Sequence, residues 1–65
     1  MKKEEIMKKI DLLYAEYKEE CEDIAEGCIE EGYPSNGSNY ELRSSSLWDD
    51  YYKEQIYFYE SLLED

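Results

Sequence analysis

With 65 residues, the chain is long enough for one small domain, residues 1–65, and its net charge at pH 7 is −11. A mean hydropathy of −0.92 and the lack of an apolar run of about 20 residues exclude a transmembrane helix. The first ten residues carry Lys but no apolar core of signal-peptide length, so we expect a cytoplasmic protein. The negative charge makes DNA, RNA and anionic lipid poor direct partners, whereas a basic protein surface is a good one.

A long amphipathic helix is predicted over residues 3–31, because apolar side chains recur there at steps of three or four residues. Gly27 is its one internal weak point. Gly32, followed by Tyr33 and Pro34, is typical of a helix end. The apolar stripe consists of Ile6, Ile10, Leu13, Tyr17, Cys21, Ile24 and Cys28.

Residues 32–45 are rich in turn-forming residues and predict a linker. After them, residues 46–49 match a capping box, in which Ser46 accepts hydrogen bonds from the first free amides and Asp49 reaches back. This motif predicts a second helix over residues 46–64. Its apolar face consists of Trp48, Tyr52, Tyr59 and Leu63, with Tyr51, Ile56 and Leu62 beside them.

Two amphipathic helices joined by a turn-rich loop predict an all-α, antiparallel helical hairpin. At about 1.5 Å per residue, the first helix would be about 42 Å long and the second about 28 Å. Such a layer leaves one side of each apolar stripe poorly covered, and a chain this short has little margin of stability. A dimeric four-helix bundle, or docking on a partner, would complete the core.

Motifs for catalysis or metal binding are missing from the sequence. There is no His for acid–base chemistry near pH 7, no glycine-rich phosphate loop, and no Ser or Cys with a plausible base. Cys21 and Cys28 are too few for a zinc site, and in an unbroken helix their Cα atoms lie about 10 Å apart, beyond disulfide reach. We expect a non-enzymatic protein without cofactor or metal, whose two thiols are half-buried; an intermolecular disulfide is the main alternative.

Residues 19–32, EECEDIAEGCIEEG, are the most distinctive segment of the chain. They hold seven carboxylates and no Lys or Arg, so like charges stack at helical spacing and destabilise the helix. A solvated helix face is the simplest interpretation, but a marginal fold that tolerates such repulsion often uses it. Neighbouring carboxylates on a helix lie about 5–6 Å apart, of the order of the phosphate spacing along a strand. Such a surface can occupy a basic groove that otherwise binds nucleic acid.

Aromatic side chains are frequent, with eight Tyr, one Trp and one Phe. Most are expected in the core, but Tyr33, Tyr40, Tyr57 and Phe58 cannot all be buried in so small a hairpin, and exposed aromatics are preferred interface anchors. We predict a partner-binding surface in which aromatic rings anchor the contact and carboxylates pair with Lys or Arg. Its predicted residues are Glu19, Glu22, Asp23, Glu26, Glu30, Glu31, Asp49, Asp50, Glu54 and Tyr57.

A short, His-free chain rich in Glu, Asp and Tyr resembles the small acidic inhibitor proteins of phages and other mobile elements. Among these are anti-CRISPR proteins and DNA-mimic anti-restriction or glycosylase-inhibitor proteins. The resemblance is one of size and composition over the whole chain. It implies an inhibitor in the host cytoplasm that blocks DNA or RNA access to a basic nucleic-acid-binding protein, such as a CRISPR effector with its Lys- and Arg-lined channels.

Two other functions fit the same sequence. A homodimeric structural or regulatory hairpin would use its acids for solubility alone. An antitoxin-like protein would neutralise a basic toxin through the same carboxylates that we assign to the inhibitor. Reversal of these acids to Lys separates the first of these alternatives from the inhibitor, because it would leave a homodimer largely unaffected.

Overall fold

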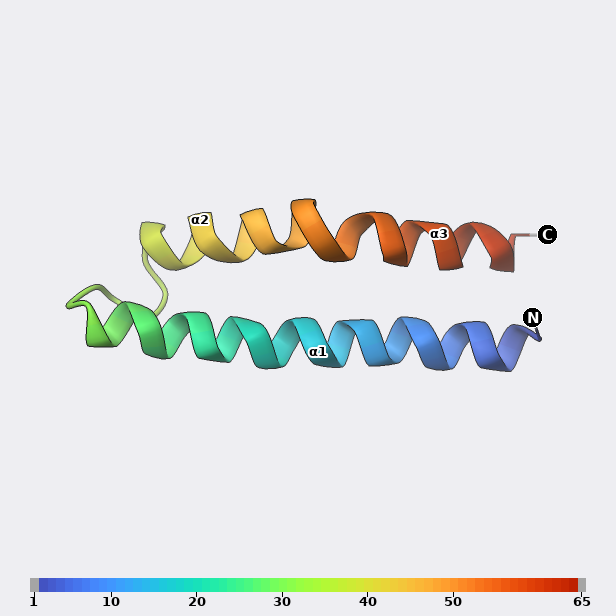
Figure 1. Cartoon of the computed structure of the whole chain (residues 1–65), viewed down its shortest axis with the longest axis horizontal. Coiled ribbons are helices and arrows are strands. Elements are labelled where there is room, and N and C mark those ends of the chain that lie inside the picture. Colours follow the sequence, from blue (N-terminus) through green and yellow to red (C-terminus); the bar gives the residue numbers. More distant parts are fainter. Residues whose placement is uncertain (1, 65) are drawn as a thin grey trace.

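The computed structural model describes residues 2–64, which form two antiparallel helical arms (Figure 1). The first arm is α1 (Lys3–Glu30). The second arm consists of α2 (Ser38–Leu47), the π-helical turn η1 (Trp48–Tyr52) and α3 (Lys53–Leu63), which follow one another without a break. Residues 2–64 contain no strand, and the molecule measures 46 × 16 × 13 Å. The predicted all-α hairpin of one long and one shorter arm is confirmed.

The end of α1 is set by Gly32, as the sequence predicts. The Gly32 amide donates to the Ile29 carbonyl at 3.0 Å, and the Tyr33 amide donates to the Cys28 carbonyl at 2.8 Å. This pair of hydrogen bonds is the Schellman motif, which needs a left-handed residue after the cap. Gly32 supplies it with φ of 89°, a conformation that costs glycine almost nothing.

The second arm begins at Ser38, so the predicted helix start at residue 46 is wrong. Residues 38–45 are helical rather than part of the linker, and the connection is limited to residues 31–37. Gly37 caps the arm with an extended backbone and no side-chain hydrogen bond. The capping box predicted at Ser46 is also wrong, because Ser46 lies inside α2 rather than at the start of a helix. The arm is therefore about 39 Å long rather than about 28 Å. The packing of Tyr40 and Ser44 on α1 outweighs the poor helix propensity of the serines.

A single wide turn interrupts the second arm at η1, where the Lys53 amide donates to the Trp48 carbonyl five residues earlier. The reason lies in the spacing of the inward-facing side chains at positions 40, 44, 48, 52 and 56. Each step of four residues passes a full turn of an α-helix by about 40°, so the stripe drifts around a regular helix. A turn with one extra residue returns Tyr52 and Ile56 to the side that faces α1. This turn was not predicted from the sequence.

The core is a single seam of side chains between the two arms. Every residue of the predicted α1 stripe is buried or half-buried, and Trp48, Tyr59 and Leu63 are half-buried on the other side. Tyr51, expected beside the second stripe, is exposed instead. Both cysteines are free and lie in the seam. The buried residues are Ile6, Leu13, Cys21, Cys28, Ser44, Tyr52 and Ile56.

No helix within residues 2–64 has the length and apolar character needed to cross a membrane.

Candidate protein-binding surface

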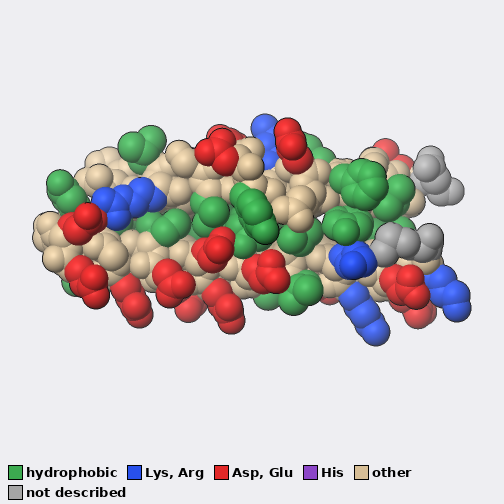
Figure 2. Space-filling model, in the orientation of Figure 1, with side chains coloured by type: hydrophobic (Ala, Val, Ile, Leu, Met, Phe, Trp, Pro, Cys, Tyr) green, Lys and Arg blue, Asp and Glu red, His purple; other side chains and the backbone are tan. Residues whose placement is uncertain are grey.

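Five of the predicted carboxylates form one surface on α1, which we call the outer acidic face: Glu19, Glu22, Asp23, Glu26 and Glu30. All five are exposed. At about 100° per residue, Glu19, Asp23, Glu26 and Glu30 point away from the side of α1 that carries Cys21 and Cys28, and hence away from the second arm. Glu22 lies at the edge of this face, about 100° around the helix from Cys21. Figure 2 shows acidic side chains in a row along this edge, in the half of α1 near the loop.

The carboxylates of the outer acidic face have no ion-pair partner in the part of the chain that the structure describes. Within residues 2–64, the one ion pair shorter than 4.0 Å joins Arg43 to Glu31, which lies outside this face. The charges are held on a helix that the seam fixes in place, so like charges remain close together despite their repulsion. A basic partner could bind this face without breaking any internal ion pair.

Glu31 differs from the other predicted acids of α1. Its Oε2 atom lies 2.6 Å from Nη2 of Arg43, and the contact raises the pKa of the Arg43 guanidinium. The arginine reaches this position because residues 38–45 are helical and bring it alongside the end of α1. A Cβ atom on Gly27 would lie 3.9 Å from Nη1 of Arg43, so the glycine faces the second arm at this crossing and does not kink the helix.

Glu20 was not among the predicted site residues, yet it has a specific partner. The hydroxyl of Tyr52, whose residue is only 1% exposed, donates to Oε2 of Glu20 at 2.6 Å. Burial of the phenol and the adjacent carboxylate raise the pKa of Tyr52. A buried hydroxyl requires a hydrogen-bond partner. The sequence signal for this role of Glu20 was its position beside the apolar stripe of α1. Glu20 therefore stabilises the seam from its rim.

The predicted residues of the second arm lie on a different edge of the molecule. Asp49, Asp50, Glu54 and Tyr57 are all exposed. Glu54 lies two residues from the inward-facing Ile56, which is about 200° around the helix, so its carboxylate points away from α1. Figure 2 shows a smaller acidic group over this arm, separate from the row on α1. Apart from Glu31, which pairs with Arg43, the predicted residues are thus divided between two opposite edges.

Exposed aromatic rings are also distributed over both arms. Tyr33, Tyr57 and Phe58 are 46–58% exposed, whereas Tyr40 is half-buried. Tyr57 has Lys53 Nζ 6.0 Å from its ring centroid, a cation–π distance. Tyr57 and Phe58 lie on α3 and Tyr33 lies in the loop after α1, so these three exposed rings are on other segments than the carboxylates of the outer acidic face.

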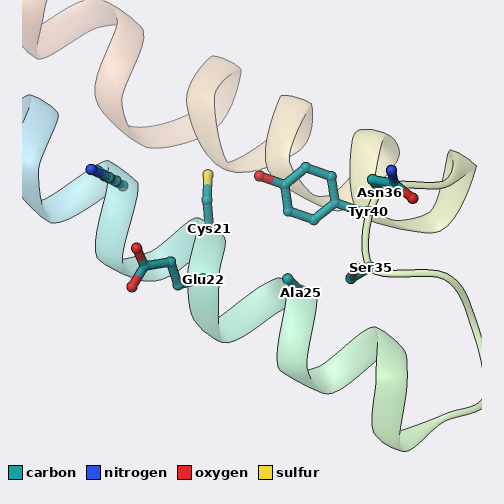
Figure 3. Close-up of a pocket in the computed structure, with 7 residues that line it drawn as sticks. Cys21, Glu22, Ala25, Ser35, Asn36 and Tyr40 are labelled. Carbon is teal, nitrogen blue, oxygen red and sulfur yellow. The ribbon is translucent and has the colours of Figure 1, made fainter.

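An open groove of about 330 Å³ lies between α1 and the loop, beside the outer acidic face. In Figure 3 the hydroxyl of Tyr40 points toward the thiol of Cys21, and this contact raises the pKa of Tyr40. Burial, together with the Cys21 contact, raises the pKa of Tyr17 to about 12, and the Tyr17 hydroxyl donates to the Ser44 carbonyl at 3.1 Å. Both phenols are protonated near pH 7 and cannot accept the thiol proton of Cys21. The groove is lined by Lys18, Cys21, Glu22, Ala25, Ser35, Asn36 and Tyr40.

Residues 2–64 contain no group of three or more Cys, Asp or Glu side chains arranged to hold a metal ion. No protein-family model, curated protein or solved structure matches the chain. The distribution of charge and apolar surface is therefore what bears on function.

Proposed function

We propose that this protein is a non-enzymatic acidic inhibitor that binds a positively charged, nucleic-acid-binding surface of another protein and blocks access of DNA or RNA. The observation that carries the proposal is the outer acidic face: five exposed carboxylates at helical spacing on one edge of a packed helix, without ion-pair partners among residues 2–64. Because the helix is already ordered, binding costs little backbone entropy.

The partner is a protein whose groove is lined with Lys and Arg. A CRISPR effector is one such protein, and it is the partner that the resemblance to small mobile-element inhibitors suggests. Inhibition would then take place in the host cytoplasm. An antitoxin-like neutraliser of a basic toxin would use the same face and the same chemistry.

Association driven by this face should be fast and sensitive to salt. Exposed charges attract a basic surface over roughly one Debye length, about 8 Å at physiological ionic strength, and added salt shortens that range. Competing DNA or RNA should displace the protein, because both occupy the same basic groove.

The test is a pull-down from a bacterial lysate with tagged protein, washed at low and at high salt, with bound proteins identified by mass spectrometry. One variant reverses Glu19, Asp23 and Glu26 to Lys on the outer acidic face. Its matched control reverses Asp49, Asp50 and Glu54 to Lys on the opposite edge and changes the net charge by the same amount. Far-UV circular dichroism checks that both variants remain helical.

We expect the first variant to lose capture of a basic, nucleic-acid-binding protein, and the control to keep it. Equal loss in both variants would mean that net charge alone attracts the partner. Capture that survives the reversal of Glu19, Asp23 and Glu26 would refute the mimicry proposal.

A homodimeric structural or regulatory hairpin, completed as a four-helix bundle, is the alternative function. It is favoured by the thin seam and by the exposed rings of Tyr51 and Phe58. In that case the acids serve solubility alone, and neither charge reversal would weaken self-association.

A further inference from the structure

The connection between the two arms places one of the two asparagines of the chain in an exposed turn. Asn36 lies in residues 31–37, outside the helices, and is exposed, whereas Asn39 lies within α2 and is half-buried. The residue after Asn36 is Gly37, and the residue after Asn39 is Tyr40. The two asparagines therefore differ in backbone order, in exposure and in the size of the residue that follows.

Pro34 and Gly37 close a tight turn around Asn36. The Gly37 amide donates to the Pro34 carbonyl at 3.4 Å, which is longer than the distance of about 2.9–3.0 Å usual for an N–H···O hydrogen bond. Such a long hydrogen bond holds the Gly37 nitrogen only weakly. Opening of this exposed turn therefore costs little free energy.

Close packing in the turn favours glycine at position 37. A Cβ atom there would lie 3.3 Å from Cβ and 3.4 Å from Cγ of Pro34. The φ angle of Gly37 is −92°, which any residue adopts, so space rather than backbone conformation makes glycine suitable. Because glycine has no side chain, its nitrogen can be approached closely by the side chain of Asn36.

We propose that Asn36 is a site of spontaneous deamidation, with solvent water as the only co-reactant. The Gly37 nitrogen attacks Cγ of Asn36, a bond forms between these two atoms, and the bond from Cγ to Nδ2 breaks. The proton of the Gly37 amide leaves with Nδ2 as ammonia. The five-membered succinimide ring that results then adds one water molecule. Opening of the new bond to Cγ gives aspartate at position 36, and opening of the main-chain bond gives isoaspartate, in which the chain continues through Cγ.

Either product adds one carboxylate to a molecule whose net charge is −11. Asn36 and Glu22 line the same groove, and Figure 3 shows Asn36 on the loop side and Glu22 on α1. Position 36 also precedes Gly37, the N-cap of α2, where negative charge interacts favourably with the helix dipole. Aspartate at this position is therefore compatible with the folded hairpin, whereas isoaspartate lengthens the turn by one main-chain atom.

Asn39 is a control within the same chain. Because it lies in α2, its backbone is held in a helical conformation, and the start of the helix must open before its side chain can close a ring. The side chain of Tyr40 also restricts approach to the attacking nitrogen. We expect Asn39 to keep its amide while the hairpin is folded.

The experiment incubates the full chain at neutral and at mildly alkaline pH, either folded or unfolded in guanidinium chloride. Fragment-ion mass spectrometry follows the replacement of NH2 by OH at each asparagine. In the folded chain, Asn36 should lose its amide at least about tenfold faster than Asn39, and within about threefold of its own rate in the unfolded chain. Unfolding should accelerate the reaction of Asn39, and alkaline pH should accelerate that of Asn36, because the attacking nitrogen must lose its proton.

Two variants assign the reaction to one residue. Asn36→Gln should abolish the early gain in mass because its side chain would have to close a six-membered ring, and the matched control Asn39→Gln should leave that gain unchanged. Equal rates at the two asparagines of the folded chain would overturn the inference. So would a reaction of Asn36 that folding slows about tenfold or more, because the turn would then protect the side chain. None of these outcomes depends on the proposed inhibitor function.

Discussion

Deletion of Asp50 tests why the second arm contains a π-helical turn. Asp50 is exposed and lies inside η1, where the hydrogen bond from Lys53 to Trp48 spans one residue more than an α-helical turn. Removing one residue should convert η1 into a regular turn. Because the residues on either side keep their direction, Tyr52 and Ile56 should still face α1.

The matched control is deletion of Glu19, which is also exposed but lies in the regular helix α1. There, loss of one residue turns one half of the helix by about 100° relative to the other. Cys21, Ile24 and Cys28 would leave the seam, at a cost of about 1–2 kcal/mol for each side chain. A loss of about 3–6 kcal/mol is comparable to the whole stability expected for 65 residues, about 3–10 kcal/mol.

We expect the Asp50 deletion to change the free energy of unfolding by no more than about 1 kcal/mol, and the Glu19 deletion to leave the chain largely unfolded. Urea unfolding followed by far-UV circular dichroism measures both. If the Asp50 deletion destabilises the protein as much as the Glu19 deletion, the wide turn does not serve to accommodate an extra residue. The explanation of η1 by the spacing of the inward-facing side chains would then be wrong.

Two further predictions concern the glycines and the half-buried phenol of Tyr17. Gly32→Ala should lower the free energy of unfolding by about 1–2 kcal/mol because φ is positive there. Gly27→Ala should raise it by about 0.5–1 kcal/mol because the site is helical and has room for a Cβ. Thermal unfolding compares the two variants, and equal effects would contradict the roles given to both glycines. Tyr17 has a pKa of about 12 in the folded chain, against 10.0 when it is unperturbed. Its contribution to stability is therefore complete below pH 10 and is lost as the pH rises toward 12. Unfolding measured over this range should show the fall, which Tyr17→Phe should reduce; an unchanged pH profile in that variant would refute the assignment.

The first arm follows from local sequence patterns alone. The stripe from Ile6 to Cys28 and the stop at Gly32 depend on residue spacing and on glycine's left-handed conformation, which are properties of neighbouring residues. Residue spacing also predicts that the outer acidic face lies opposite Cys21 and Cys28, because all of these residues belong to one helix and are related by its fixed rotation per residue. These features needed no knowledge of the second arm.

The extent of the second arm and the division of the candidate site depend on contacts between the two arms. The serine-rich stretch before Trp48 is a poor helix former, and it becomes helical because Tyr40 and Ser44 pack on α1. That packing brings Arg43 to Glu31, so this one of the predicted α1 carboxylates forms an ion pair within the hairpin. It also drives the turn at η1, since only contact with α1 requires the inward side chains to stay in line. Two helices that share one seam must direct their other charges outward on opposite edges, and no pattern within either helix alone could have shown this.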